Sequence, residues 1–410
     1  YLLQCLQRDS SHDKKSTRES ISSSSVQTHF ETFLHIVKSS LGSGLLATPD
    51  AFKNAGIGLG LVGMAVAVLV ITHATSILVT FANNFTSYQY YCLFFCLFFS
   101  RKFVKVFSVI TYYGVNTVYV VLIASSAKQL IENHIEWSLN IRWYILLVLV
   151  LILPLGIIKL MKFLAPFSAI ANVCLFVGLG IILFKIMDDL PPLSERPLVA
   201  PIEKVPLFFA TMLFGLEGIG TVLPVENEMK NPDHFLGWTG VLSVSMFFIG
   251  LVNAIVGLFG YWKYGDAVCG SISLNMEQDC QFLIAVAILF TYGLQMTVTS
   301  EVTSNSCHLS VIDFVFILFI CFFIVYFHVT AIVAAIIPNL APIISLFGAI
   351  GFSMLGLFCP AVIDFVLFYD VEKGLTDWRC WKNILLIIAA FSATFLGAYT
   401  SLADIISNYN

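Results

Sequence analysis

Long apolar stretches, separated by short segments that contain glycine, proline or charged residues, make up most of this chain of 410 residues. A helix that crosses a lipid bilayer needs about 20 mainly apolar residues. This pattern predicts eleven spans, near 32-54, 57-82, 104-131, 142-158, 162-187, 205-228, 236-264, 281-302, 312-337, 339-368 and 382-402. Only 11% of the residues are charged, against roughly 25% in soluble domains. The expected fold class is therefore an all-α polytopic membrane protein.

The spans divide the chain into segments with different expected roles. Residues 1-30 include a polar, serine-rich run that cannot bury enough apolar surface to fold, which predicts a disordered tail. Residues 31-187 and 205-368 each hold five spans and are joined by a loop at 188-204, whereas 369-410 hold a further loop, the eleventh span and the C-terminus. A cytosolic N-terminus puts about two thirds of the Lys and Arg residues on the cytosolic side, as the positive-inside rule favours. An odd number of spans then places the C-terminus outside the cell or in a lumen.

Charge and cysteine content argue against several classes of site. The net charge of -4 is too small and too dispersed to indicate a nucleic-acid partner. The ten cysteines include no CxxC pair and no histidines at zinc-site spacing, so neither a metal site nor a bound cofactor is expected. Cys269 and Cys280 share a predicted outer loop, where they can form a disulfide or remain free thiols. The apolar run at 88-99 is too short to cross a bilayer.

Two of the predicted spans contain glycines near their centres, although glycine costs roughly 1 kcal/mol relative to alanine inside a helix. Gly42, Ser43 and Gly44 interrupt the first span, and Gly215 begins a glycine-rich stretch around Glu217 in the sixth. The interrupted spans lie five spans apart, which is typical of secondary transporters with inverted repeats. Close helix packing is the alternative explanation, because glycine is common where membrane helices touch.

Four motifs carry a resemblance to a known family: HIVKSSLGSGLLATPDAFKNAG at 35-56, FGLEGIGTVLPVENEM at 214-229, GSISLN at 270-275 and IIPNLAPIISLFGAIG at 336-351. From about residue 30 to 402 the chain resembles the proton-coupled amino-acid transporters of the amino acid/auxin permease family, in its SLC36-like branch. It departs from that branch at Ser39 and Ser40, where a glycine and an asparagine are usual. The resemblance implies a LeuT-like fold with a 5+5 inverted repeat, in which helices 1 and 6 are broken.

The resemblance also implies that the broken middles of these two helices bind the substrate. An interrupted helix exposes amide groups at the start of its second half, where the helix dipole favours an anion, and carbonyl groups at the end of its first half, which favour a cation. An amino acid carries both charges. We therefore expect its carboxylate at Gly42, Ser43 and Gly44, its ammonium at Phe214, Gly215 and Leu216, and Tyr119 of the third span nearby.

Two ionisable residues are candidates for proton coupling, with the proton as the coupling ion. Glu217 lies in an otherwise apolar span, where an ionised carboxylate costs roughly 2.5 to 3.5 kcal/mol, so it needs a proton or a partner. His35 precedes the first break by about two turns and matches the histidine that the branch uses in proton coupling, and histidine titrates near physiological pH. The structural alternatives are a permanently protonated acid that bridges helices and a histidine at the membrane edge.

Other polar residues in the spans receive structural interpretations. Lys38 is expected to extend toward the membrane surface or to pair with an acid. His73 and His328 are expected to be hydrogen-bonded residues of the core. Glu226 and Glu228 lie near the cytosolic end of the sixth span, as part of a gate or of a solvated edge.

The sequence predicts a secondary transporter that moves small neutral amino acids, such as glycine, alanine and proline, together with protons by alternating access. Its partners are the amino acid, protons and the lipid bilayer of the plasma or lysosomal membrane. The alternative is an amino-acid sensor at the lysosomal membrane, which transports little and signals through a partner. No filter sequence indicates a channel, and no nucleophile and base pair or HExxH motif indicates an enzyme.

Overall fold

The computed structural model describes residues 27–84, 101–133, 139–157, 161–216, 218, 222, 225–227, 229–304, 333–334, 337, 339–369 and 378–407. Within these ranges all regular secondary structure is helical apart from one isolated β-bridge, which confirms the all-α class. Several predictions fall outside the described residues: most of the tail at 1-30, the run at 88-99, most of the span at 312-337, and Glu217, Glu228 and His328.

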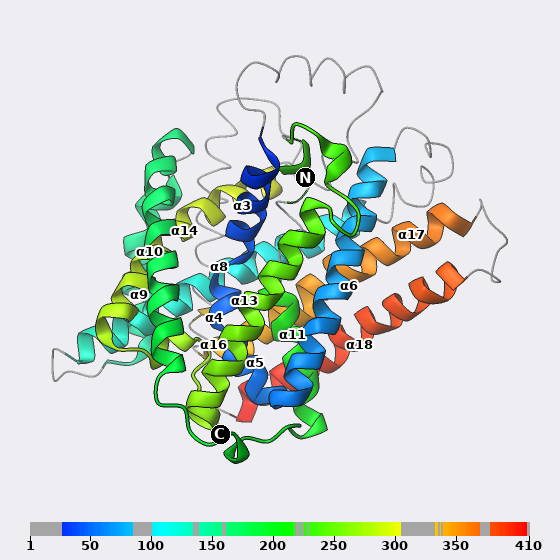
Figure 1. Cartoon of the computed structure of the whole chain (residues 1–410). Helices are drawn as coiled ribbons and strands as arrows, with labels where there is room; N and C mark the ends of the chain where they lie inside the picture. The colour runs from blue at the N-terminus through cyan, green and yellow to red at the C-terminus, as the bar shows by residue number, and fades with distance from the viewer. Residues whose placement is uncertain are drawn as a thin grey trace.

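Helices occupy the predicted spans that lie within the described residues (Figure 1). The first span is divided into α3 (His29–Ser40), α4 (Ser43–Leu46) and α5 (Thr48–Ala55). The tenth span runs from α16 (Leu340–Phe347) through two π-helical turns, η7 (Gly348–Phe352) and η8 (Met354–Phe358), into α17 (Cys359–Tyr369). The remaining spans correspond to α6 (Ile57–Asn84), α8 (Arg101–Glu132), α9 (Ile141–Ile157), α10 (Met161–Met187), α11 (Val205–Gly215), α13 (Val241–Tyr264), α14 (Gln278–Ser304) and α18 (Trp378–Ser407). Five of these helical segments are long and apolar enough to cross a membrane.

The first span is interrupted where the sequence predicts it. α3 begins with a capping box, in which the Thr28 amide donates to the Glu31 carboxylate at 2.7 Å and the Glu31 amide donates to the Thr28 hydroxyl. α3 ends at Ser40, and the backbone is not helical at Leu41, with ψ at 80°, or at Gly42, with ψ at -147°. α5 then restarts with Pro49 in its first turn, where no amide donor is needed. The predicted break at Gly42 is confirmed.

The sixth span is interrupted as well. α11 has Pro206 in its first turn and ends at Gly215, where the Leu216 amide donates to the Met212 carbonyl at 2.9 Å. Gly218 is described but not helical, whereas residues 225–227 are helical again. The predicted break in the sixth span is confirmed.

The seventh span starts later than predicted. α13 begins at Val241 rather than near 236, because Gly237 adopts a φ of 108°. This left-handed conformation suits glycine and does not fit a right-handed helix.

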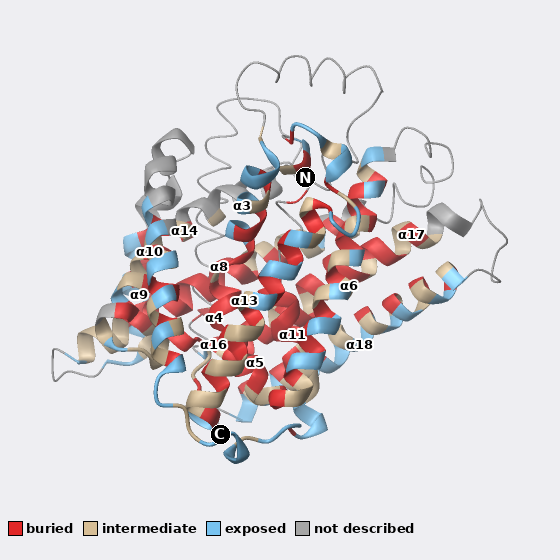
Figure 2. Cartoon of the chain, in the orientation of Figure 1, coloured by how far each residue is buried: buried red, intermediate tan, exposed pale blue. Residues whose placement is uncertain are grey.

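α5, α11 and α13 form the buried centre of the bundle. The rings of Phe52 and Phe208 meet edge to face with their centroids 6.2 Å apart, and both side chains are fully buried. Gly257 of α13 lies directly against Phe52, since an added Cβ there would be 2.5 Å from the ring. Buried residues gather at this centre, whereas many outer residues of α6, α10 and α18 are exposed (Figure 2). This distribution suits a bundle whose outer face meets lipid.

The π-helical part of the tenth span packs closely on its neighbours. A Cβ added at Gly348 would lie 1.9 Å from the Ala210 carbonyl of α11, so only glycine permits this approach. The Ser345 and Ser401 hydroxyls lie 2.9 Å apart and connect α16 to α18. Phe352 packs edge to face on Phe214, with ring centroids 5.6 Å apart. The tenth span thereby holds the end of α11 in place.

α3 begins at one end of the bundle and α18 ends at the opposite end (Figure 1). We call these the α3 end and the α18 end. At the α18 end the loop at 188-204 is fixed to the helices, because the Ala200 amide donates to the Ala55 carbonyl at 2.8 Å. The Arg196 guanidinium also donates to the Trp262 carbonyl at 3.0 Å.

Candidate substrate site

The two broken helices meet at their breaks. A Cβ added at Gly44 would lie 2.5 Å from the Gly215 Cα and 3.1 Å from the Phe214 carbonyl oxygen. In the other direction, a Cβ added at Gly215 would lie 3.3 Å from the Gly44 carbonyl oxygen. The two backbones are therefore in direct contact, and glycine at both positions makes this contact possible.

The residues predicted to bind substrate all lie around this crossing. A Cβ added at Gly42 would lie 3.3 Å from the Tyr119 hydroxyl, so the third span contributes to the same place. Ser43, Phe214, Leu216 and Tyr119 are all buried. The structure thus brings together residues that are far apart in the sequence, and their binding of a substrate stays a prediction.

Sequence reasoning missed two polar residues at the crossing. Asn253 of α13 is fully buried, and its Nδ2 donates to the Ile249 carbonyl at 2.8 Å. Its Oδ1 has no hydrogen-bond partner among the described residues and lies 3.8 Å from a Cβ added at Gly215. The Ser40 hydroxyl is likewise buried without a partner there, 2.8 Å from a Cβ added at Gly218. A lone asparagine in an apolar span was the available signal for Asn253.

Of the two predicted proton-coupling residues, the structure describes only His35, and it does not bring His35 to this crossing. His35 is exposed on α3, seven residues before Gly42, or about 10 Å of helix. Lys38 is also exposed on α3. Glu217 lies outside the described residues.

At the α3 end of the bundle, the residue before the start of α3 contacts the segment that follows the sixth span. Gln27 forms a parallel β-bridge with Met229, and the Lys230 amide donates to the Gln27 carbonyl at 3.0 Å. Glu226 is 1% exposed and accepts from the Asn83 amide group of α6 at 3.2 Å. Of the two interpretations of Glu226, burial rules out the solvated edge.

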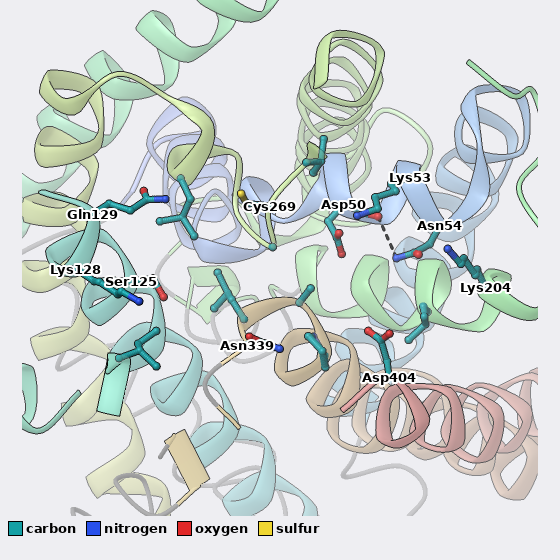
Figure 3. Close-up of a pocket in the computed structure, with 18 of the residues that line it drawn as sticks. Asp50, Lys53, Asn54, Ser125, Lys128, Gln129, Lys204, Cys269, Asn339 and Asp404 are labelled. Atoms are coloured by element: carbon teal, nitrogen blue, oxygen red, sulfur yellow. Dashed lines mark hydrogen bonds between the residues drawn. The ribbon is translucent and has the colours of Figure 1, made fainter. Parts of the chain in front are cut away.

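A cavity of about 740 Å³ lies at the α18 end (Figure 3). Its walls come from α5, α8, α16, α18 and the short helical turns η3 (Ile202–Lys204) and η6 (Ile272–Asn275). The lining includes both acidic and basic side chains, as well as the half-buried thiol of Cys269. The sequence did not predict this cavity, because its walls come from segments that only the tertiary fold brings together.

The possible disulfide between Cys269 and Cys280 is absent, since both residues are free thiols. The Cys280 side chain is buried against α10, where its Sγ lies 3.8 Å from the Gly178 carbonyl. Cys269 instead lines the cavity, and its amide donates to the Asn275 side chain at 2.9 Å. Of the two alternatives for this pair, the structure has the free thiols, with Cys280 packed on a neighbouring helix.

An ion pair between a buried acid and a partly buried lysine, together with a histidine, connects three helices near the start of α18. The Lys382 ammonium lies 2.8 Å from the Asp364 carboxylate and 2.9 Å from His73 Nε2. The Asn383 amide group donates to the same carboxylate at 2.8 Å. His73 is hydrogen-bonded, as predicted, but it is exposed rather than part of the core. These contacts connect His73 of α6 and Asp364 of α17 to Lys382 of α18.

The Cys269 thiol gives a measurable response to pH. Burial raises the pKa of this thiol, Lys53 lowers it, and the Asp50 carboxylate raises it. Because the thiolate is the nucleophile, we expect iodoacetamide to alkylate Cys269 more slowly than free cysteine at pH 8. The rate should still be rising at the pH where the rate for free cysteine levels off, near its ordinary pKa of about 8.5.

Mass spectrometry of the peptide that contains Cys269 measures this rate, and a Cys269→Ser variant identifies the signal. A rate that levels off at or below the pH at which free cysteine levels off would contradict the prediction.

The fold and the crossing define a class of protein: an integral, multi-pass membrane protein with two interrupted helices, as is typical of secondary transporters. The family model described as transmembrane amino acid transporter protein matches residues 25–403, and the chain belongs to this family. It is 32% identical to the proton-coupled amino acid transporter-like protein pathetic of Drosophila melanogaster, over 93% of this chain and 86% of the relative. It is 25% identical to the amino acid transporter AVT3C of Arabidopsis thaliana, over 93% of this chain and 92% of the relative. The family predicted from the motifs is confirmed, and it is a family of transporters rather than enzymes.

Proposed function

We propose that this protein is a proton-coupled transporter of small neutral amino acids that works by alternating access. The observation that carries the proposal is the direct contact of the two helix breaks at Gly44 and Gly215. The similarity to a proton-coupled amino acid transporter-like protein supports the choice of coupling ion. We further propose a LeuT-like 5+5 repeat, a cytosolic N-terminus and a location in the plasma or lysosomal membrane.

The chemistry of the crossing suits an amino acid. Unpaired backbone amides at the first break favour a carboxylate, and carbonyls at the end of α11 favour an ammonium group. The buried Asn253 Oδ1 adds an acceptor that lacks a donor among the described residues. Space is limited, because an added methyl at Gly42 would already approach the Tyr119 hydroxyl to 3.3 Å. A small side chain on the substrate fits these limits best.

Alternating access requires that each end of the bundle opens in turn. The contacts of Gln27 with Met229 and Lys230 close the α3 end, whereas the α18 end contains the cavity. We assign this arrangement to a state that faces the α18 side. Release on the other side then requires that the bridge between Gln27 and Met229 separates.

Proton coupling supplies enough free energy for accumulation. One proton carries about 1.36 kcal/mol per pH unit and about 2.3 kcal/mol per 100 mV of membrane potential. One pH unit and 100 mV together concentrate a neutral substrate several-hundredfold, by roughly 1.4 kcal/mol for each factor of ten.

Uptake of labelled alanine and proline into liposomes, with and without an inward proton gradient, tests this function. We expect gradient-driven accumulation in the wild type and at least about a tenfold reduction in Glu217→Gln or His35→Ala, because a residue that carries the proton cannot be replaced by one that does not titrate. His29→Ala and Glu203→Gln are matched controls on exposed residues and should transport normally.

The remaining outcomes distinguish a transporter from an amino-acid sensor. Saturable amino-acid binding without uptake would overturn transport and support the sensor function. Neither uptake nor binding, in protein that elutes as a single folded species, would overturn both functions.

A further inference from the structure

The cavity at the α18 end contains equal numbers of opposite charges. Its ionisable lining residues, apart from the thiol, are three acids and three lysines: Asp50, Glu132, Asp404, Lys53, Lys128 and Lys204. Both signs occur on the same side of the cavity, where Asp50 and Asp404 lie near Lys53 and Lys204 (Figure 3). A wall with both signs and no net charge is complementary to a zwitterion rather than to a simple anion or cation.

Asp50 is the residue of this wall that most needs a partner. It is 8% exposed, and its carboxylate forms no hydrogen bond or ion pair with any residue that the structure describes. The ionisable groups that face it are Lys53 on the same helix, Lys204 on η3, Asp404 on α18, and Cys269. A buried carboxylate without a partner is costly in a membrane protein, which makes it a candidate for binding a ligand.

Asp50 both lines the cavity and lies close to the first break along the chain. It belongs to α5, the helix that restarts after the first break, and it follows Gly44 by six residues, which at the helical rise correspond to about 9 Å. The cavity volume of about 740 Å³ lies within the range of roughly 300 to 1,000 Å³ that is typical of small-molecule sites. The cavity can therefore hold a small amino acid before it reaches the crossing.

We propose that this cavity is a loading site for the zwitterion of a small amino acid, with the ligand ammonium bound to Asp50. Asp404 supplies a second acceptor, and Lys53 and Lys204 bind the ligand carboxylate by charge-assisted hydrogen bonds. The inference rests on the proposed function, because it assigns a second position to the same substrate.

Protection of Cys269 from alkylation measures occupancy of the cavity directly. In the full-length protein, alanine should slow the reaction of Cys269 with the neutral reagent iodoacetamide. We expect Asp50→Asn to raise the alanine concentration for half-maximal protection by at least about tenfold, since a hydrogen bond to a charged group is lost. Glu203→Gln, an exposed acid next to Lys204 that does not line the cavity, should leave that concentration within twofold of the wild type. Each variant is compared with and without alanine, because Asp50 itself changes the reactivity of the thiol.

Fragments of the ligand separate a zwitterion site from a simple ion site. Propionate lacks the ammonium and ethylamine lacks the carboxylate, so neither should protect Cys269 at concentrations where alanine does. Equal protection by ethylamine would mean that the cavity binds any cation and would overturn the proposal.

Gly44→Val and Gly42→Val separate the loading site from the crossing, because both obstruct the breaks without touching the cavity lining. Protection that persists in either folded variant supports the loading site, and protection lost in both overturns it. No protection in a wild-type protein that still accumulates alanine would overturn the loading site and leave transport standing. Protection without any accumulation would support the loading site and overturn transport.

Discussion

Replacing Gly44 by alanine is expected to lower alanine uptake by about 100-fold, because a displacement of about 1 Å at a reacting or binding centre has effects of that size. The added methyl carbon would lie 2.5 Å from the Gly215 Cα. Because that Cα is a backbone atom, no side-chain rotation can relieve the clash. The crossing must therefore open, and the amides and carbonyls around it lose their arrangement. Initial uptake per mole of reconstituted protein is the measurement.

Gly180→Ala provides the matched control, because it adds the same methyl group to another glycine of a membrane helix. Nothing lies within 4 Å of a Cβ added at Gly180, which is exposed on α10. Uptake should be unchanged, and alanine should stabilise the helix by up to about 1 kcal/mol. Wild-type uptake in Gly44→Ala would place substrate binding away from the crossing. If Gly44→Ala does not fold, Gly42→Ala tests the same crossing from its neighbouring position.

The main elements of the fold were predictable from the sequence because their signals are local. A run of about 20 apolar residues specifies a span wherever it lies. The breaks were predictable for the same reason, since Gly42 and Gly215 disfavour a helix at their own positions. The start of α13 was misplaced because the left-handed conformation of Gly237 depends on the turn that precedes the helix.

The contacts between distant segments were not predictable in this way. Gly44 meets Gly215, and His73 meets Lys382 across more than 300 residues of sequence. The family resemblance implied the first contact, whereas nothing in the sequence indicated the second. Whether Cys280 is buried or accessible depends on which face of α14 packs on α10, and one sequence does not specify that choice.

Asp50 shows how a local signal can be overlooked. It follows Pro49 in a motif whose glycines predict the helix break, and nothing in the sequence around it assigns a role to its charge. Its role depends on the cavity, which the tertiary fold forms and which the Asp50 side chain lines, and on the burial of its carboxylate. The crossing and the cavity use different chemistry, since the first offers mainly backbone groups and the second mainly charged side chains. A substrate that carries both charges can bind to each in turn.

Asp364→Ala is expected to lower the free energy of unfolding by about 3 to 5 kcal/mol, the cost of leaving one member of a buried ion pair alone. The Asp364 side chain is 8% exposed, and it accepts hydrogen bonds from both Lys382 and Asn383 at 2.8 Å. Its removal leaves the Lys382 ammonium without its acid in a partly buried position. Reversible unfolding of the protein in bicelles, followed by steric trapping, measures the change.

The exposed ion pair of Lys185 and Glu277 tests whether burial causes the expected loss of stability in Asp364→Ala. Its atoms lie 2.7 Å apart, almost the same distance as in the buried pair, but its side chains are 41% and 75% exposed. Glu277→Ala should therefore cost about 1 kcal/mol or less. The double variant Asp364→Leu with Lys382→Leu should recover part of the loss, because it leaves no unpaired charge, although Asn383 and His73 still lose a partner. Equal losses of unfolding free energy in Asp364→Ala and Glu277→Ala would show that burial contributes nothing. A double variant as unstable as Asp364→Ala would assign the lost stability to hydrogen bonding rather than to an isolated charge.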